Sequence, residues 1–420
     1  MFFVDKIIGQ EKDRVKEKKR EREPVDGVSG LSIGKEEEPA RENLLRNRSC
    51  FFSLISIGSF SIPKFMSENN DAAKEIRKGE ELDSSRLEEF LKDSLPRLEG
   101  KLTLRQFPGG HSNLTYLLTF SNREMVLRRP PLGSKVKGAH DMKREYTVLQ
   151  ALIPVFPYVP RPLIYTEDTS IIGCPFYVME RLRGKIIRQH LPEGVSLSPA
   201  QAGRLGRNIM KVLSRLHTLD YQKIGLEDFG KPRGYLERQV QGWIGRYRNA
   251  RTPDVPDGED VMAWLEANKP PDVDHPAIVH GDWKPDNIVL DEEDPTEIIG
   301  VLDWEMATIG DPFMDATYTM IYFNEKAEQD ALGISATLPA VLRASISREE
   351  LLEHYRHYSG LTVPNPDFYY ILNMFRLAGL LQQIYYRYYQ GVTKDQRFEM
   401  FKTTSHLLIG SAQKVMARTG

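Results

Sequence analysis

One stretch, IVHGDWKPDNIVLDEEDPTEIIGVLDWE (residues 278–305), constrains the fold of this chain more than any other. Its apolar runs at residues 278–279, 288–290 and 298–302 predict short buried strands. The polar residues left at the ends of these runs are His280, Asp282, Asn287 and Asp303. We therefore expect the chemistry of the protein to lie at these strand ends.

These side chains suit magnesium-dependent phosphoryl transfer. Asp282 and Asn287 bracket a tight loop, and Asp303 ends the next strand, so a hairpin-like return can bring them to one end of the same small sheet. Carboxylate and amide oxygens, completed by water and phosphate, are ligands that Mg²⁺ prefers. A carboxylate that is not a ligand can accept a hydroxyl proton. The pattern thus indicates in-line transfer from a nucleotide, in which positioning and charge neutralisation supply most of the catalysis.

Three motifs in order carry a family resemblance. HGDWKPDN resembles the HGDxxxxN loop of the aminoglycoside phosphotransferase and choline kinase family, LDWE lies where that family has its second metal-binding Asp, and GDPFMDATY resembles its GDPxxD segment. The resemblance implies that Asp282 positions and deprotonates an acceptor hydroxyl and that Asn287 and Asp303 hold Mg²⁺. His280 is expected to organise the loop rather than transfer a proton, and Asp315 is expected to cap a loop.

The family's nucleotide loop is expected upstream. KLTLRQFPGGHSNLTYLLTF predicts two strands joined by a turn at Pro108, Gly109 and Gly110, where backbone amides can approach phosphate oxygens. Such turns are mostly plain hairpins, and this one departs from the protein-kinase pattern GxGxxG. The resemblance makes Gly109 and Gly110 the candidate phosphate contacts.

A third strand, EMVLRRPP, carries Arg128 where kinase-like proteins have a phosphate-binding Lys. Strand alternation puts Arg128 and Arg129 on opposite faces, and we expect Arg128 to point inward. AHDMKREYTVLQALI predicts a helix whose Glu145 would pair with Arg128. Arg keeps the charge but differs from Lys in reach, so efficiency or nucleotide choice could change.

The strand CPFYVMERLRG resembles the hinge of two-lobed kinases, so the adenine edge is expected to meet main-chain groups near Glu180 and Leu182. These assignments predict an α+β, two-lobed kinase-like fold, with a small antiparallel β lobe over residues 66–183 and a larger, mainly helical lobe over 184–420. Helices are expected at 83–98, with Ser84 or Ser85 as N-cap, and at 199–217, 235–248, 260–267, 348–357, 368–390 and 395–416. The resemblance implies that the block 234–267 helps build the acceptor site. Arg376 and Arg387 could face an anionic acceptor, as could any solvent-facing Arg.

Residues 1–65 differ from the rest. A mixed-charge run at 11–24 predicts a disordered leader. The apolar run at 50–65 is too short and too interrupted to span a membrane, and it lies too far inside the chain for an ordinary secretory signal. Organelle targeting stays open, and so does a start of the native protein at Met66, which we favour.

The composition limits the classes of function that the protein can have. The net charge of −2 gives no electrostatic argument for binding nucleic acid or an acidic membrane, and only two cysteines favour a reducing, cytoplasmic location. We expect an enzyme that phosphorylates a hydroxyl of a small molecule, with ATP as co-substrate and Mg²⁺ as cofactor; GTP is the less favoured donor.

The LRRPP and HGDWKPDN blocks are also similar to phosphotransferase-like domains fused to acyl-CoA dehydrogenases, which favours a hydroxyacyl-CoA acceptor over an aminoglycoside or a choline-like alcohol. A protein kinase is disfavoured, because no activation loop with an A-P-E segment separates LDWE from GDPFMD. A catalytically inactive nucleotide-binding module stays open because of Arg128. The sequence does not predict an oligomeric state.

Overall fold

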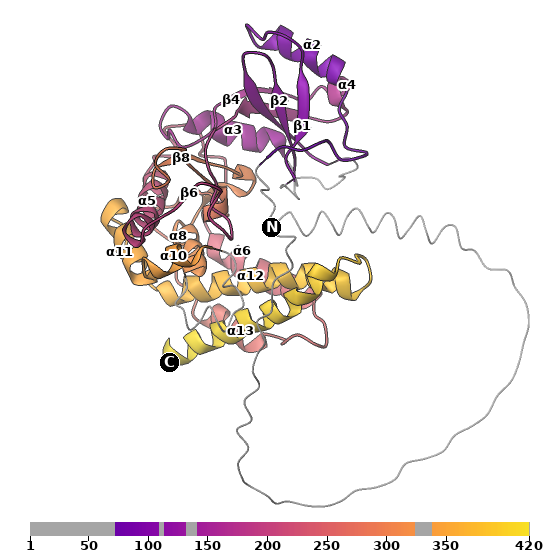
Figure 1. Cartoon of the computed structure of the whole chain (residues 1–420). Helices are drawn as coiled ribbons and strands as arrows, with labels where there is room; N and C mark the ends of the chain where they lie inside the picture. The colour runs from indigo at the N-terminus through magenta and orange to yellow at the C-terminus, as the bar shows by residue number, and fades with distance from the viewer. Residues whose placement is uncertain (1–71, 109–112, 132–140, 324–337, 420) are drawn as a thin grey trace, which may run out of the picture. The chain divides into compact units, whose positions relative to one another are not determined.

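The computed structural model describes residues 72–108, 113–131, 141–323 and 338–419. They contain a five-stranded antiparallel sheet, two small two-stranded sheets and a set of helices, most of which follow the larger sheet in the chain (Figure 1). These residues fall within one compact unit of the chain. The predicted leader at 1–65 and the two hairpin glycines, Gly109 and Gly110, lie outside the described residues. This arrangement of sheets and helices agrees with the predicted α+β, two-lobed kinase-like fold.

The sheet has the strand order β1-β2-β3-β5-β4 and every neighbouring pair is antiparallel. Its strands are β1 (Thr103–Gln106), β2 (Leu114–Thr119), β3 (Glu124–Arg129), β4 (Pro162–Thr166) and β5 (Phe176–Glu180). β3 is central and almost wholly buried, so a charged side chain on it must find partners inside the protein. The side chains of Arg128 and Arg129 must therefore each reach polar or charged partners inside the protein.

The predicted helices are present, and their bounds differ from the predicted ranges by a few residues at most. Figure 1 shows their arrangement. The helices of the described residues are α2 (Ser84–Ser94), α3 (Met142–Leu152), α4 (Thr169–Ile172), α5 (Pro199–His217), α6 (Tyr235–Asn249), α7 (Glu259–Ala267), α8 (Phe313–Met320), α10 (Ala340–Ala344), α11 (Arg348–Ser359), α12 (Pro366–Tyr389) and α13 (Met400–Thr419).

The first helix, α2, differs from its prediction at both ends. Its N-cap is Asp83, which accepts a hydrogen bond from the amide of Arg86, so the expected cap at Ser84 or Ser85 is wrong. The helix ends at Ser94 instead of reaching residue 98, because Leu95 precedes Pro96 and is extended (φ −120°, ψ 122°).

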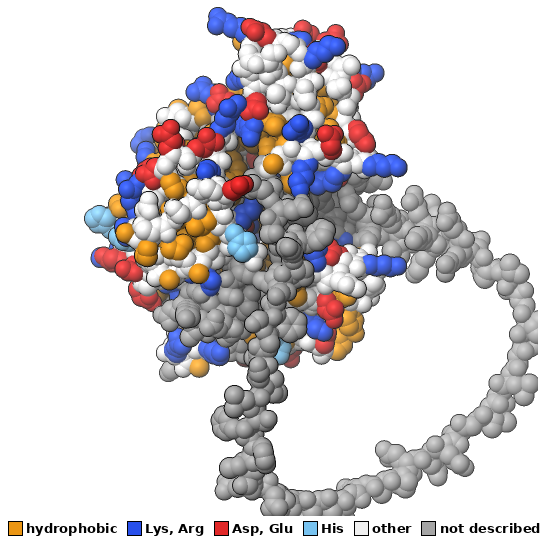
Figure 2. Space-filling view, in the orientation of Figure 1, with side chains coloured by type: hydrophobic (Ala, Val, Ile, Leu, Met, Phe, Trp, Pro, Cys, Tyr) orange, Lys and Arg blue, Asp and Glu red, His pale blue; other side chains and the backbone are white. Residues whose placement is uncertain are grey.

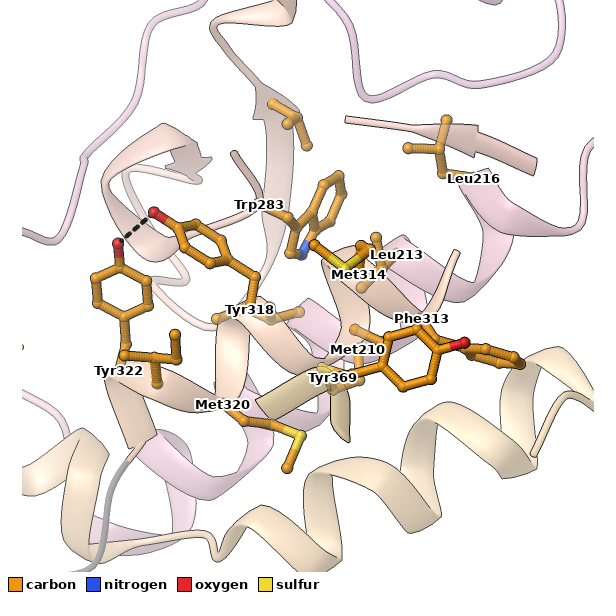
Figure 3. Close-up of a cluster of buried hydrophobic side chains, with 14 of the residues drawn as sticks. Met210, Leu213, Leu216, Trp283, Phe313, Met314, Tyr318, Met320, Tyr322 and Tyr369 are labelled. Carbon is orange, nitrogen blue, oxygen red and sulfur yellow. Dashed lines mark hydrogen bonds between the residues drawn. The ribbon is translucent and has the colours of Figure 1, made fainter. Parts of the chain in front are cut away.

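The helix α8 was not predicted. All of its residues are buried, so it has no polar face and gives no helical periodicity in the sequence. Figure 3 shows Met314 and Tyr318 of α8 packed with Leu213 of α5 around Trp283. Trp283 belongs to the HGDWKPDN loop and is fully buried, so the core of the helical lobe anchors this loop.

Lys, Arg, Asp and Glu side chains are interspersed over the face seen in Figure 2, without one large basic area. Among the described helices, none has the length and apolar character that crossing a membrane requires.

A buried carboxylate at the start of α8 makes stability depend on pH. Asp311 is 2% exposed and accepts hydrogen bonds from Tyr369 Oη (2.7 Å) and the amide of Phe313 (2.9 Å), yet burial raises its pKa to about 6. The folded pKa lies above the unfolded value of 3.8, so stability is greatest below that value and falls as pH rises towards 6. The loss is about 3 kcal/mol by neutral pH.

We therefore expect Asp311→Asn to become more stable, relative to the wild type, as pH rises. The difference in free energy of unfolding between variant and wild type should increase by about 2 kcal/mol from pH 4 to pH 7.5, because Asn cannot ionise. Urea unfolding at several pH values measures this. The same substitution at exposed Asp93 controls for the loss of a surface charge, and a difference at position 311 that does not change with pH would refute the assignment.

Candidate active site

Two separate two-stranded sheets position the predicted catalytic residues. β6 (Ala277–Val279) pairs with β9 (Thr308–Gly310), and β7 (Ile288–Leu290) pairs with β8 (Ile298–Val301). The expectation of one small sheet is therefore wrong. It failed because β9, which was not predicted, takes β6 as its partner.

The β7–β8 hairpin still brings two of the predicted residues to one end. Asn287 precedes β7 and Asp303 follows β8, and the amide of Leu302 donates to the carbonyl of Asn287 (2.8 Å). Asp282 joins them from β6, because Asn287 Nδ2 donates to Asp282 Oδ2 (3.1 Å) and to the Asp282 carbonyl (2.9 Å). The three residues thus form one connected group.

Asp282 is held as a carboxylate. Burial opposes its ionisation, but the positive charges of Lys284 and, more weakly, Arg376 outweigh this and lower its pKa to about 2. An ionised carboxylate at neutral pH can accept a proton from a hydroxyl group. The structure is therefore consistent with the predicted role of Asp282.

Lys284 is a residue of this site that the sequence reading missed. Its Nζ lies 2.9 Å from Asp282 Oδ2, and Asp282 raises its pKa although burial acts in the opposite direction. The available signal was its place in HGDWKPDN, two residues after Asp282. The half-buried ammonium of Lys284 adds positive charge beside Asp282, and such a charge can stabilise a phosphoryl group.

His280 and Asp315 organise the loop, in agreement with the sequence reading. The fully buried His280 accepts a hydrogen bond at Nδ1 from the amide of Asp282 (3.2 Å), and its Nε2 faces the carbonyl of Leu302 (3.0 Å). Asp315 of α8 accepts from the amides of His280 (2.6 Å) and Gly281 (2.9 Å). Both ring nitrogens of His280 are therefore used in positioning the backbone.

Asp303 and Asn287 have the chemistry of magnesium ligands. Both line a cavity of about 510 Å³ together with Arg128. Among the described residues, no group of three or more His, Cys, Asp or Glu side chains could hold a metal ion. Mg²⁺ is usually bound through one or two protein oxygens, with substrate phosphates and water completing its shell.

Asp303 also has an unusual backbone. It is left-handed (φ 68°, ψ 62°), a conformation that Asp and Asn adopt more readily than other non-glycine residues. The turn that ends β8 therefore favours the same residue types as the metal site.

Arg128 points inward, as predicted, and meets three carboxylates. Its Nε lies 3.4 Å from Glu145 Oε2, its Nη2 donates to Asp303 Oδ1 (2.9 Å), and Glu305 Oε2 is 3.9 Å away. Burial lowers the pKa of Arg128, but these carboxylates outweigh it and keep the guanidinium charged, whereas burial raises the pKa of Glu145. Arg128 thus connects α3 with the segment that carries Asp303.

Arg129 lies on the opposite face and has a structural role. Its guanidinium donates to Tyr116 Oη (2.8 Å) and to the carbonyl of Glu80 (3.1 Å), which fastens the segment before α2 to the sheet.

The predicted hinge residues line the same cavity as Arg128 and Asp303. The Glu180 amide already donates to the carbonyl of Arg161 (2.9 Å), so this amide is not free to bind a base. Leu182 lies against Gly300 of β8, where a Cβ would come within 2.1 Å of Leu182 Cδ1. Gly300 therefore allows the hinge to approach the β7–β8 hairpin.

The glycines predicted to contact phosphate, Gly109 and Gly110, lie outside the described residues, but Asn113, which directly precedes β2, reaches the site. Asn113 Nδ2 donates to Glu305 Oε2 (2.8 Å). Glu305, which the sequence reading did not assign, thereby joins the end of the β1–β2 turn to the segment after Asp303. Its signal was its place in LDWE.

Comparison with known proteins agrees with this geometry. A family model described as "Phosphotransferase enzyme family" matches residues 103–348, which include β1 to β9 and the predicted site residues, whereas Arg376 lies beyond the match. The chain belongs to this phosphotransferase family. The chicken (Gallus gallus) and human (Homo sapiens) acyl-CoA dehydrogenase family member 11 are 36% and 33% identical to it, over 76% and 82% of this chain. The match covers 41% and 44% of those proteins, so the chain spans less than half the length of these relatives.

Solved structures support the fold of this phosphotransferase family member. A Ralstonia eutropha protein, provisionally described as an aminoglycoside phosphotransferase, has a TM-score of 0.66 and 29% identity, with coverage of 80% of this chain and 99% of that one. Choline kinase from Cryptosporidium parvum has a TM-score of 0.53 and 12% identity, with coverage of 80% and 97%. The latter likeness is one of fold alone.

Proposed function

We propose that the chain is an ATP-dependent kinase that phosphorylates a hydroxyl group of a small molecule, and that this molecule is a hydroxyacyl-CoA. The observation that carries the proposal is the connected group of Asp282, Asn287 and Asp303 beside a cavity lined by Arg128 and the hinge. A binding module without chemistry would not require an ionised, half-buried Asp282 hydrogen-bonded to a residue that lines such a cavity.

In this proposal each residue has one task. Asp282 orients the acceptor hydroxyl and receives its proton, and Lys284 supplies positive charge beside the transferred group. Arg128 binds the nucleotide phosphates and is oriented by Glu145, while main-chain groups near Glu180 and Leu182 receive the base. Asn287 and Asp303 would hold Mg²⁺, which when bound neutralises charge on the phosphates.

The proposal of a hydroxyacyl-CoA acceptor rests on the names of the similar proteins. Proteins with a matching region are named acyl-CoA dehydrogenases, and the rest of their length is not represented in the match. A phosphotransferase region joined to an enzyme of acyl-CoA chemistry favours an acceptor that carries the same thioester. Aminoglycosides and choline-like alcohols are the alternatives.

An ADP-release assay tests the proposal. The purified chain is incubated with Mg²⁺ and ATP or GTP, and with hydroxyacyl-CoAs of different chain length, choline-like alcohols and aminoglycosides in turn. We expect acceptor-dependent ADP release with ATP and a hydroxyacyl-CoA, and a product heavier than the acceptor by one phosphoryl group.

Other results of this assay would change the proposal. Turnover with only a drug or an alcohol would overturn the acceptor class. Tight binding of Mg-ATP with no turnover on any acceptor would favour the inactive nucleotide-binding module, for which the contact between Arg128 and Asp303 is the relevant observation.

A further inference from the structure

Arg376 of α12 lies against the catalytic loop although it is far from it in sequence. Its Nη2 donates to the carbonyl of Gly281 (2.5 Å). The guanidinium lies 4.8 Å from the ring centroid of Tyr318 and 5.9 Å from that of Trp243, so α8 and α6 each contribute an aromatic wall beside it. Arg376 thus binds the protein's own backbone in this structure, whereas its place in the sequence suggested that it could face an anionic acceptor.

The carbonyl that Arg376 binds belongs to the peptide unit leading into Asp282. The amide of the same unit donates to His280 Nδ1 (3.2 Å), so both polar groups of this peptide are held. The preceding unit is fixed as well, because the Gly281 amide donates to Asp315 Oδ1 (2.9 Å). The orientation of this peptide plane determines the direction in which the Asp282 side chain leaves the backbone.

The backbone at Gly281 cannot be rigidified by a side chain. Gly281 has φ +83°, and a Cβ there would come within 2.9 Å of the carbonyl oxygen of Met306. Since this position requires glycine, which has the greatest conformational freedom, its geometry depends on external contacts. Asp315 and His280 hold the two amides, and Arg376 supplies the contact to the carbonyl.

We propose that Arg376 is a positioning residue for phosphoryl transfer: by binding the Gly281 carbonyl it fixes the peptide that aims Asp282 at the acceptor hydroxyl. This inference rests on the proposed kinase function. It assigns to α12 a part in the reaction that the HGDWKPDN, LDWE and GDPFMD motifs do not contain.

The test uses three variants of the full chain. Arg376→Met keeps an apolar stem between the aromatic walls and removes the hydrogen bond, Arg376→Lys keeps the charge and one donor, and Arg376→Ala removes both. Arg348→Ala is the matched control, because Arg348 also stacks on an aromatic residue of α12, Tyr370 (4.6 Å). Thermal unfolding of each variant checks that the fold is retained.

Hydrogen exchange of the amides at residues 280–284 gives a readout that does not depend on activity. We expect exchange at least about 10-fold faster in Arg376→Met and Arg376→Ala, a partial recovery in Arg376→Lys, and no change in Arg348→Ala. Unchanged exchange in the Met and Ala variants would overturn the inference, whether or not an acceptor has been found.

Kinetics provide the second readout. We expect kcat to fall by about 10- to 100-fold in Arg376→Met, because a small misplacement of a reacting group has effects of this size, while the Kd of Mg-ATP, measured with a fluorescent ATP analogue, stays within about 2-fold. A parallel loss of Mg-ATP affinity, or an unchanged kcat, would overturn the positioning role. Absence of turnover in the wild type would instead contradict the proposed function and leave the exchange result to decide on Arg376.

Discussion

Asp282→Asn should lower kcat by about two to four orders of magnitude while Mg-ATP still binds. The amide cannot accept a proton from the acceptor hydroxyl. The substitution keeps the size of the side chain and an oxygen for the hydrogen bond from Asn287 Nδ2, so the loop should keep its shape. ADP release measures kcat, and titration with a fluorescent ATP analogue measures nucleotide binding.

The matched control is Asp291→Asn. Asp291 begins the turn of the same β7–β8 hairpin and accepts hydrogen bonds at Oδ1 from the amides of Glu293 (2.9 Å) and Asp294 (3.0 Å), which Asn can also accept. This variant should retain wild-type activity. If Asp282→Asn turned over at the wild-type rate, or lost nucleotide binding with turnover intact, the assigned role of Asp282 would be wrong.

The second large effect is expected for Asp303→Asn. Asn adopts the left-handed conformation of this position as readily as Asp, so the variant removes the negative charge without adding backbone strain. It weakens a Mg²⁺ ligand and the contact with Arg128 Nη2. We expect kcat/KM to fall by about 10³-fold and the half-saturating Mg²⁺ concentration to rise by at least about 10-fold.

A magnesium titration of ADP release measures both quantities. Asp303→Ala serves as a comparison, because it removes the charge and also places Ala in a left-handed conformation, so its additional loss of stability in urea unfolding measures the strain. An Asp303→Asn variant with wild-type activity and an unchanged magnesium requirement would exclude Asp303 from the metal site.

The fold and the centre of the site were predictable because they depend on local patterns. The apolar runs around HGDWKPDN predict short strands whose polar flanks meet at strand ends, and alternation along β3 separates Arg128 from Arg129. The pairing of Arg128 with Glu145 followed from the resemblance to kinase-like proteins, and the burial of β3 explains why the charge needs such a partner.

Contacts between distant segments were not predictable in the same way. The pairing of β6 with β9, the buried helix α8 and the contact of Arg376 with Gly281 depend on which surfaces pack together. Lys284 and Glu305 belong to the motifs, but the motifs do not show what they contact. Only the structure shows that Lys284 lies beside Asp282 and that Glu305 lies beside Asn113 and Arg128.

The sequence by itself determined the short strands and the type of polar groups at the β6 and β7–β8 strand ends, because periodicity and motif spacing are properties of neighbouring residues, and the family resemblance of its motifs implied the two-lobed kinase-like fold. Only the tertiary structure decided how Asp282 is held: its low pKa comes from Lys284 and Arg376 acting against burial, and its backbone is fixed by His280, Asp315 and Arg376. Coulomb interactions and hydrogen bonds depend on distance in space, and chain order does not specify that distance until the helices and strands have packed.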